Sequence, residues 1–369
     1  MSDLRYWLGF SRVRGIGPLR LRSLLDCYGS IERAWHASAE QLRSAGVDGR
    51  SIGNLLKARS ELDLDSEVER MEALGAHALT WDDPDYPRLL LETSAPPPVL
   101  YVKGRLKKED GWAVAIVGTR RASTYGREAT RRLASALARN GITIVSGMAR
   151  GIDGVAHRAA LESGGRTIAV FGCGIDQIYP PEHRKLASQI AAQGALVSDY
   201  PPGTRPEARN FPPRNRIISG LSLGVLVTNA GKSSGALITA DFAAEQGRDV
   251  FAVPGSILTQ GSIGPNRLIQ DGAKLVTNAE DVLEELNLTM VAEQVEARRV
   301  LPEDETEAAL LRHLSEEPTH VDELQQQSNL TISEVSSTLA LMELKGMVRQ
   351  VGGMKYVVAR ESGVEYVID

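Results

Sequence analysis

Short apolar runs alternate with longer amphipathic stretches through the middle of the chain. Each run holds five or six residues rich in valine and isoleucine, and each is followed by a glycine- or proline-containing turn and a stretch of helical periodicity. Apolar runs of this length separated by helices are typical of βαβ units, in which helices cover both faces of a parallel sheet. The predicted strands are 113–117, 142–146, 167–171, 195–199, 223–228 and 249–253.

A different pattern precedes these strands. Residues 1–65 have the spacing of short helices, and Gly15, Gly17 and Pro18 in RGIGPLRLRSLL indicate a tight turn before a helix. The following stretch to about residue 109 is mixed, with prolines that disfavour helix. We assign that stretch to the start of a central domain over residues 66–288.

The C-terminal part has its own plan, after a polar linker near residues 289–305. Three helices are predicted there, and two strands, MVRQ and KYVV, are joined by Gly352-Gly353. That succession is typical of a winged helix, placed at 301–360. We therefore expect an α/β fold: an extended Rossmann-like parallel sheet domain between an N-terminal helical (helix-hairpin-helix or SAM-like) domain and a C-terminal winged-helix domain. The predicted helices are 307–315, 321–328 and 332–345.

Composition narrows the class of protein. A chain of 369 residues with 24% charged and 5% aromatic residues is expected to form two or three globular domains. No apolar run reaches bilayer length and no secretory signal pattern occurs, so a cytoplasmic location is expected. Cys27 and Cys173 fit no metal-ligand spacing, so neither a metal nor another cofactor is predicted.

The net charge of −5 is unevenly spread. Residues 301–369 hold 13 acidic and 5 basic side chains, a balance of −8, so the preceding 300 residues carry +3. Because local fields and not chain averages attract ligands, the chain's overall acidity does not exclude a polyanionic partner for its main body.

Glycines, hydroxyls and basic side chains recur where the predicted strands end. Carboxyl ends of parallel strands meet at one edge of a sheet, and glycine-rich turns there can hold phosphate oxygens through backbone N–H groups. Several such turns with few acids fit an extended polyanion better than one small phosphate. The residues are Gly118, Thr119, Arg120 and Arg121 after the first strand, Arg150 after the second, and Lys232 and Ser233 after the fifth.

The stretch NFPPRNRIIS, residues 210–219, follows the fourth strand. We interpret it as a stiff loop in which the Phe211 ring stacks on a base, worth about 1–3 kcal/mol, while Arg214 and Arg216 hold the nucleic-acid backbone on either side. The alternatives are that the ring folds into the loop's own core and that the arginines form ion pairs across the sheet end. At least one of the two arginines is expected to be structural.

A competing hypothesis is a nucleotide-processing enzyme. Asp153, at a predicted helix start, could act as an acid or base, or could be an N-cap; His157, one turn later, fits a satisfied helix histidine better than a general base. The segment GVLVTNAGKSSG does not match an ATP-binding P-loop, because six residues separate Gly224 from Gly231 where that motif has four.

Seven segments in order resemble the DNA-processing protein A family (DprA, also called Smf). The resemblance implies a non-enzymatic, cofactor-free protein that binds single-stranded DNA, forms a homodimer through the Rossmann-like domain and loads the RecA recombinase. It also implies protection of incoming strands during natural transformation. A Rossmann-like phosphoribohydrolase remains the alternative. The segments are VGTRRASTYG, SGMARGIDGVAHRAAL, GCGIDQIYPPEHRKL, SDYPPG, NFPPRNRIISGLS, SGALITADFAAEQGRDVFAVPGS and GSIGPNRLIQDGAKLV.

Carried over residue by residue, the resemblance places the DNA pocket at two loops and at a third contact before a helix. These are Gly118, Thr119 and Arg120; Phe211, Arg214, Asn215 and Arg216; and Lys232 with Ser233. The chain departs from the family at Asn229, where relatives often carry an acid.

The flanking domains carry open alternatives. The GIGP turn, with Arg14, Arg20 and Arg22 nearby, either contacts a DNA phosphate through its backbone or is structural. The third helix of the winged helix offers Glu334 and Glu343 against Lys345, which favours a protein contact over duplex DNA.

Overall fold

The structure is a computed structural model that describes residues 3–288, 304–315, 317–328, 330–345 and 347–358. These residues form two compact units, Met1–Asn287 and Leu288–Asp369, which are described separately. Most of the predicted linker, residues 289–303, lies outside the described residues, as do residues 359 and 360 at the end of the predicted winged helix.

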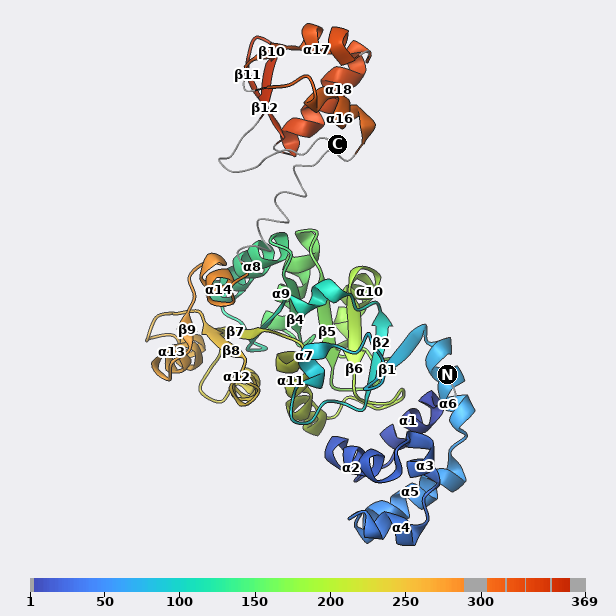
Figure 1. The fold of residues 1–369 in the computed structure, drawn as a ribbon. Helices are drawn as coiled ribbons and strands as arrows, with labels where there is room; N and C mark the ends of the chain where they lie inside the picture. The colour runs from blue at the N-terminus through green and yellow to red at the C-terminus, as the bar shows by residue number, and fades with distance from the viewer. Residues whose placement is uncertain (1–2, 289–303, 316, 329, 346, 359–369) are drawn as a thin grey trace. The chain divides into compact units, whose positions relative to one another are not determined.

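A nine-stranded sheet forms the centre of the first unit (Figure 1). Its strand order is β1-β2-β6-β5-β4-β3-β7-β8-β9, and the pairs from β6 through β9 are parallel, whereas β1 and β2 add an antiparallel edge. The six predicted strands are confirmed, with ends shifted by one residue at most. The strands are β1 (Ala76–Thr80), β2 (Val99–Gly104), β3 (Ala113–Gly118), β4 (Thr143–Ser146), β5 (Thr167–Phe171), β6 (Ala195–Ser198), β7 (Gly224–Asn229), β8 (Asp249–Ala252) and β9 (Lys274–Leu275).

Helices cover both faces of this sheet, as the apolar runs predict. Along β5, Ile168 and Val170 face one hydrophobic cluster, whereas Ala169 and Phe171 face another, which is the period-2 alternation of a strand buried on both sides. Helices α8 (Thr124–Arg139), α9 (Ile152–Glu162) and α10 (Arg184–Gln193) lie on one face, and α11 (Phe211–Gly220) and α12 (Gly235–Glu245) on the other (Figure 1).

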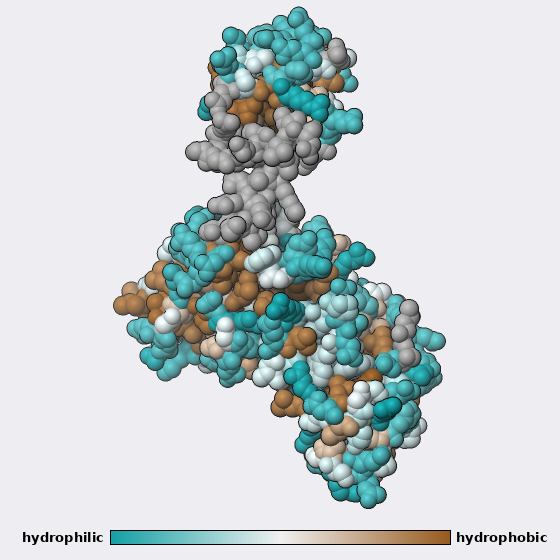
Figure 2. All heavy atoms as spheres, viewed as in Figure 1, coloured by the Kyte–Doolittle hydropathy of each residue, from teal (hydrophilic) through white to brown (hydrophobic). Residues whose placement is uncertain are grey.

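Short helices complete this unit. They are α7 (Arg88–Leu91), α13 (Ile263–Gln270) and α14 (Glu280–Glu285), with 3-10 turns η1 (Lys108–Gly111), η2 (Pro181–His183), η3 (Ala208–Asn210) and η4 (Gln260–Ser262). Figure 2 shows hydrophobic residues on the surface beside α13 and β9, where the sheet ends. Among the described residues, no helix is both long and apolar enough to cross a bilayer.

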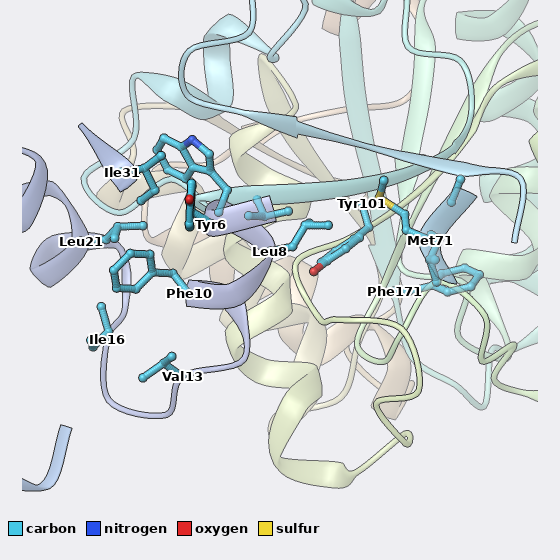
Figure 3. Packing of buried hydrophobic residues seen from close by; sticks show 14 of the residues in the cluster. Tyr6, Leu8, Phe10, Val13, Ile16, Leu21, Ile31, Met71, Tyr101 and Phe171 are labelled. Atoms are coloured by element: carbon cyan, nitrogen blue, oxygen red, sulfur yellow. The ribbon is translucent and has the colours of Figure 1, made fainter. Parts of the chain in front are cut away.

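The N-terminal helices pack directly against the sheet. Tyr6 and Phe10 of α1 share one hydrophobic cluster with Tyr101 of β2 and Phe171 of β5 (Figure 3), so this region and the sheet form one compact unit. The predicted turn before the second helix is present: Gly15 has φ of +95°, and Pro18 is the first residue of α2. The helices are α1 (Leu4–Ser11), α2 (Pro18–Tyr28), α3 (Ile31–His36), α4 (Ala39–Ser44), α5 (Gly49–Glu61) and α6 (Leu64–Ala73).

The second unit is the winged helix that the sequence predicts. Its sheet has the order β10-β12-β11, and Gly352 and Gly353, with φ of +100° and +58°, make the turn between the two wing strands. Leu310, Leu324 and Leu339 meet in its core. The elements are α16 (Glu305–Leu311), β10 (Thr319–His320), α17 (Val321–Ser328), α18 (Ile332–Leu344), β11 (Val348–Gly352) and β12 (Lys355–Val358).

Candidate nucleic-acid interface

A pocket of about 400 Å³ lies at the carboxyl ends of the central strands. Strands β4, β5 and β6 lie on one side of β3, and β7 and β8 on the other, so the pocket occupies the point where the strand order reverses. Crevices at such points are the usual ligand sites of open α/β sheets. The lining residues are Val117–Arg121, Ala149, Asp153, Ala208, Phe211, Pro212, Arg214, Asn215, Ile218, Ser234–Ala236, Ile238 and Thr239.

The pocket brings together residues that are distant in the sequence. Its walls come from the loop after β3, the turn after β4, the start of α11 and the start of α12. Seven residues predicted as binding residues line it: Gly118, Thr119, Arg120, Arg121, Phe211, Arg214 and Asn215. Arg150, Arg216, Lys232 and Ser233 do not.

Phe211 lies beside Arg120 at the rim. The Arg120 guanidinium carbon is 5.5 Å from the centroid of the Phe211 ring, close enough for a cation–π contact. Gly172 makes room for the ring, because a Cβ on Gly172 would lie 2.8 Å from the Phe211 Cδ1 atom. Phe211 is partly exposed, so its ring is not fully buried in a core of its own segment.

The segment that carries Phe211 is the first turn of α11 and not the loop that the sequence suggests. Pro212 and Pro213 follow at once, and proline is tolerated in a first helical turn because the backbone N–H groups there have no partner within the helix. The two prolines thus start a helix where they were interpreted as stiffening a loop.

Arg214 belongs to the floor of the pocket. Its side chain is buried, and Nη1 donates to the carbonyl oxygens of Val170 and, over 2.9 Å, Gly147. Asp153 faces it and accepts from the backbone N–H groups of Gly147 and Ala149, each at 3.2 Å. Burial raises the pKa of Asp153 and lowers that of Arg214, and each charge partly offsets the effect on the other. Arg214 therefore links the residue after β4 to the end of β5.

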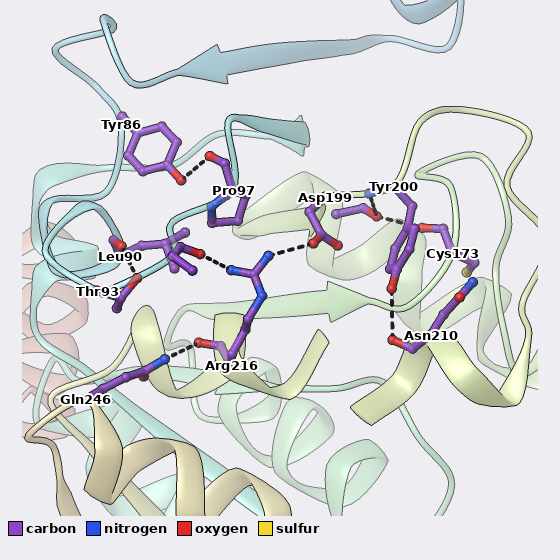
Figure 4. Close-up of polar contacts among 12 residues, drawn as sticks. Tyr86, Leu90, Thr93, Pro97, Cys173, Asp199, Tyr200, Asn210, Arg216 and Gln246 are labelled. Carbon is purple, nitrogen blue, oxygen red and sulfur yellow. Dashed lines mark hydrogen bonds and ion pairs between the residues drawn. The ribbon is translucent and has the colours of Figure 1, made fainter. Parts of the chain in front are cut away.

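Arg216 does not line the pocket, so its predicted place beside Phe211 is wrong. Its guanidinium donates to the Ala95 carbonyl oxygen and forms an ion pair with Asp199 across 3.0 Å (Figure 4). Successive residues of an α-helix are rotated by about 100°, so two residues two positions apart point in opposite directions. Arg216 is the structural arginine that the ion-pair alternative describes.

The other predicted contacts lie outside the pocket. Arg150 is exposed and forms an ion pair with Glu182. Lys232 and Ser233 are exposed in the loop before α12, and their neighbours Ser234 and Gly235 line the pocket instead. Ser234 accepts from the Ala236 backbone N–H as the N-cap of α12. The sequence signal that could have located this part of the pocket is the Ser234-Gly235 pair, which lies between a predicted strand and the helix after it.

The acid and base of the enzyme hypothesis are both inside the fold. The Thr167 hydroxyl donates to the Ile144 carbonyl oxygen and so accepts from His157 Nδ1, 2.7 Å away. His157 is therefore the neutral Nδ1–H tautomer, and burial lowers its pKa to about 3. No ligand reaches this ring, since its exposure is 0%. Asp153 is held by the two backbone N–H groups described above.

Asn229 is buried at the end of β7. Its Oδ1 atom accepts from the Ser123 N–H at 3.2 Å, and its Nδ2 atom donates to the Gly261 carbonyl oxygen at 3.0 Å. Its backbone carbonyl oxygen also accepts from the Thr119 N–H at 2.7 Å. Asn229 thus fixes the loop after β3 against the segment before α13.

Positive charge outweighs negative charge around the pocket. Arg120 and Arg121 are exposed, whereas Asp153, the acidic residue of the lining, is buried opposite Arg214. Helix α12 begins at the wall of the pocket, and helix N-termini favour anions. Among the described residues, no group of three or more acidic, cysteine or histidine side chains could hold a metal ion.

Two of the three arginines near the GIGP turn, Arg20 and Arg22, have partners within the first unit. Arg20 donates to the Gly15 carbonyl oxygen at 2.6 Å and forms an ion pair with Asp48. The Arg22 guanidinium lies 5.0 Å from the centre of the Trp81 ring system. Arg14 is exposed.

Comparisons with known proteins agree with this architecture. Residues 77–287 match the family model described as DNA recombination-mediator protein A, and residues 294–354 match the winged-helix domain of DprA. Protein Smf from Synechocystis is 39% identical, and the alignment covers 96% of this chain and 98% of that protein. Protein Smf from Escherichia coli is 40% identical, and the alignment covers 91% of this chain and 93% of that protein.

Two solved structures are also similar. DNA processing protein A from Streptococcus pneumoniae aligns with a TM-score of 0.67 at 37% identity, covering 76% of this chain and 96% of that one. DNA processing protein A from Helicobacter pylori, whose structure is described for its single-stranded DNA binding mode, aligns with a TM-score of 0.52 at 33% identity. The alignment covers 57% of this chain and 96% of that one. The fold and these matches together show that the chain belongs to the DNA recombination-mediator protein A (DprA/Smf) family.

Proposed function

We propose that this protein binds single-stranded DNA in the pocket at the ends of β3, β4 and β7 and delivers the strand to a recombinase. The observation that carries the proposal is the exposed Arg120 guanidinium beside the partly exposed Phe211 ring. A cation and an aromatic face at one place suit a ligand with alternating phosphates and bases. The relative from H. pylori is described as binding single-stranded DNA.

Each part of the pocket has a role in this proposal. Arg120 and Arg121 neutralise phosphates, the glycine-rich loop around Gly118 lets the sugar-phosphate backbone approach, and the α12 N-terminus adds a favourable dipole. Phe211 stacks on a base without reading its identity. Arg214 and Asn215 act from below, holding the strand ends and the starts of α11 and α12 in place.

The wider role follows the family. We infer a cytoplasmic, non-enzymatic mediator that protects incoming single strands during natural transformation and loads RecA onto them. No cofactor is needed for this role, because the work is positioning and charge neutralisation. Burial of Asp153 and His157 supports a binding function over the nucleotide-processing alternative.

The same proposal includes a homodimer formed through the Rossmann-like domain. Ile257 and Leu258, between β8 and α13, are 87% and 91% exposed, and Ile263 at the start of α13 and Leu275 of β9 are also exposed. Apolar side chains gathered at a sheet edge are typical of an interaction surface. A second copy paired there would place two pockets on one assembly.

Charge reversal at Arg120 tests the pocket. Arg120→Glu should weaken binding to oligothymidylate at least about ten-fold and lower the slope of log affinity against log salt, by about 0.7 for the lost phosphate contact. The measurement is fluorescence anisotropy at several salt concentrations, with thermal unfolding as the check on folding. Arg139→Glu is the matched control, since Arg139 is exposed at the other end of α8.

Two results would contradict the proposal. Equal affinities of Arg120→Glu and Arg139→Glu would remove the pocket from DNA binding. Release of free base from nucleoside monophosphates by the wild-type protein would instead favour the enzyme.

A further inference from the structure

A second aromatic ring lies next to Phe211, outside the lining of the pocket. Tyr179, in the segment between β5 and α10, has its ring centroid 5.7 Å from that of Phe211, with an angle of 36° between the two planes. Tyr179 is 38% exposed, so much of its surface faces solvent. This separation lies within the range of about 4.5–7 Å at which paired aromatic side chains attract one another.

We propose that Tyr179 is a second base-stacking position, which extends the single-strand site beyond the pocket toward Arg150. This inference rests on the proposed function of the pocket. Its ligand is two successive nucleotides of one unpaired strand, one base on Phe211 and the next on Tyr179. Rings on neighbouring positions of a basic groove are a common way to hold single strands without sequence preference.

The Phe211 ring does not need Tyr179 to be held in place. Gly172 lies against one part of that ring, and the buried Arg214 guanidinium lies 5.8 Å from its centroid. Tyr179 therefore adds an exposed aromatic surface to a ring that is already supported from below. A purely structural aromatic pair would bury this surface.

Basic side chains stand at both ends of the ring pair. Arg120 lies over Phe211, and Arg150 lies beside Tyr179: the hydrogen bond to Glu182 and, to a smaller extent, interaction with Tyr179 raise the pKa of Arg150. The two rings thus lie between two cations. That order fits a strand whose phosphates meet Arg120 and Arg150 and whose bases meet the rings.

The ion pair between Arg150 and Glu182 does not block this arrangement. Both side chains are exposed, at 55% and 49%, and exposed ion pairs contribute little to stability. Arg150 can therefore exchange the carboxylate for a phosphate oxygen. A duplex would not fit, because its bases are already stacked on one another and offer no free face.

The test compares Tyr179→Ala, Tyr179→Phe and a control, Trp112→Ala, in the full chain. Trp112 is 44% exposed, comparable to Tyr179, and precedes the first residue of β3, at the opposite end of the sheet from the pocket. Binding is measured to oligothymidylate and to an abasic oligodeoxynucleotide of the same length. Tyr179→Ala should bind oligothymidylate about 5-fold or more weakly, whereas Tyr179→Phe and Trp112→Ala should stay within about 2-fold of the wild type.

The abasic probe separates stacking from charge. It keeps the phosphates but offers no base, so Tyr179→Ala should bind it as the wild type does. Equal affinity of Tyr179→Ala and wild type for oligothymidylate would overturn the inference, and so would an equal loss on the abasic probe. Failure of the wild type itself to bind oligothymidylate would instead overturn the proposed function.

A reporter variant covers the case in which Tyr179→Ala does not fold. Tyr179→Trp keeps an aromatic face, and its fluorescence, after subtraction of the wild-type signal, should be quenched by oligothymidylate but not by the abasic probe. The same quenching with both probes, or with neither, would count against a stacked base at this position.

Discussion

Arg214 and Arg216, two positions apart, have different roles in this protein. Arg214 bonds to strand-end carbonyl oxygens under the pocket, whereas Arg216 bonds to Ala95 and Asp199 on another side of α11. Residue types alone predicted both as phosphate contacts. Which arginine faces the pocket depends on the position of each residue around the α11 helix. Because the two prolines were interpreted as part of a loop, there was no helical periodicity from which to predict this.

Arg120 and Phe211 were accessible to sequence reasoning for a physical reason. Both follow the carboxyl end of a strand, Arg120 in the loop after β3 and Phe211 at the start of the helix after β6, and the parallel topology that the apolar runs predict brings those ends together. Tyr179 was not singled out, although it also follows a predicted strand, because nothing local distinguishes an exposed tyrosine from a buried one.

A buried neutral histidine should make stability depend on pH. Folding keeps His157 uncharged, with a pKa of about 3 against about 6.5 in the unfolded chain, so the unfolded state binds more protons between these values. The free energy of unfolding should therefore fall as pH drops below 6.5, by about 2 kcal/mol at pH 5 from this residue alone.

Denaturant unfolding of the wild type and His157→Gln at pH 7 and pH 5 measures this effect. The variant should lose less stability between the two values, even if it is less stable at pH 7. An identical loss in both proteins would show that His157 titrates in the folded protein as it does in the unfolded chain.

At the scale of elements, hydrophobic patterning located the central strands well and the sheet's antiparallel edge poorly. Strands β3 to β8 are fully or largely apolar because helices cover both faces. Strand β1 exposes His77, and β2 follows three consecutive prolines, so neither had the expected pattern. Loops were harder still, because their positions depend on long-range contacts such as those of Asn229.

Removing the Asn229 amide should loosen two elements at once. Asn229→Ala leaves the Ser123 N–H and the Gly261 carbonyl oxygen without their side-chain partner, which should cost about 1–3 kcal/mol of stability. Because Thr119 and Arg120 belong to the same loop, affinity for oligothymidylate should also fall, by about three-fold or more.

Asn140→Ala is the control for this change. The Asn140 side-chain amide also donates a hydrogen bond, to the Ala136 carbonyl oxygen, but at the far end of α8. The Asn140→Ala variant should lose some stability and keep the DNA affinity of the wild type. Wild-type affinity in Asn229→Ala would mean that the loop after β3 is positioned without this residue.

At the scale of the whole molecule, charge and apolar surface are separated between regions. The described part of the winged helix is rich in acidic residues, among them Glu307, which accepts from Lys345, and Glu334, whose carboxylate accepts from the backbone N–H of Thr331, the N-cap of α18. The basic pocket and the exposed apolar residues beside α13 belong to the first unit. This division supports a DNA-binding first unit and a winged helix that contacts protein.

The apolar surface beside α13 gives a prediction about assembly. Two charges introduced together, Ile257→Asp and Leu258→Asp, should convert a dimer to a monomer, because each would have to be buried against its own symmetry mate. Both side chains are almost fully exposed in the single chain, so folding should be unaffected. Light scattering and thermal unfolding measure the two outcomes, with the exposed Leu19→Asp of α2 as the control.

Loss of the dimer should affect long strands more than short ones. An oligonucleotide that reaches both pockets binds the second at a high effective concentration, whereas one that fills a single pocket gains nothing from the partner. The double variant should therefore lose about ten-fold or more in affinity for a long oligothymidylate and stay near wild type for a short one. Equal losses at both lengths would mean that the substitutions disturb the pocket itself. A wild-type protein that scatters as a monomer at all concentrations would remove the dimer from the proposed function and leave the single pocket to act alone.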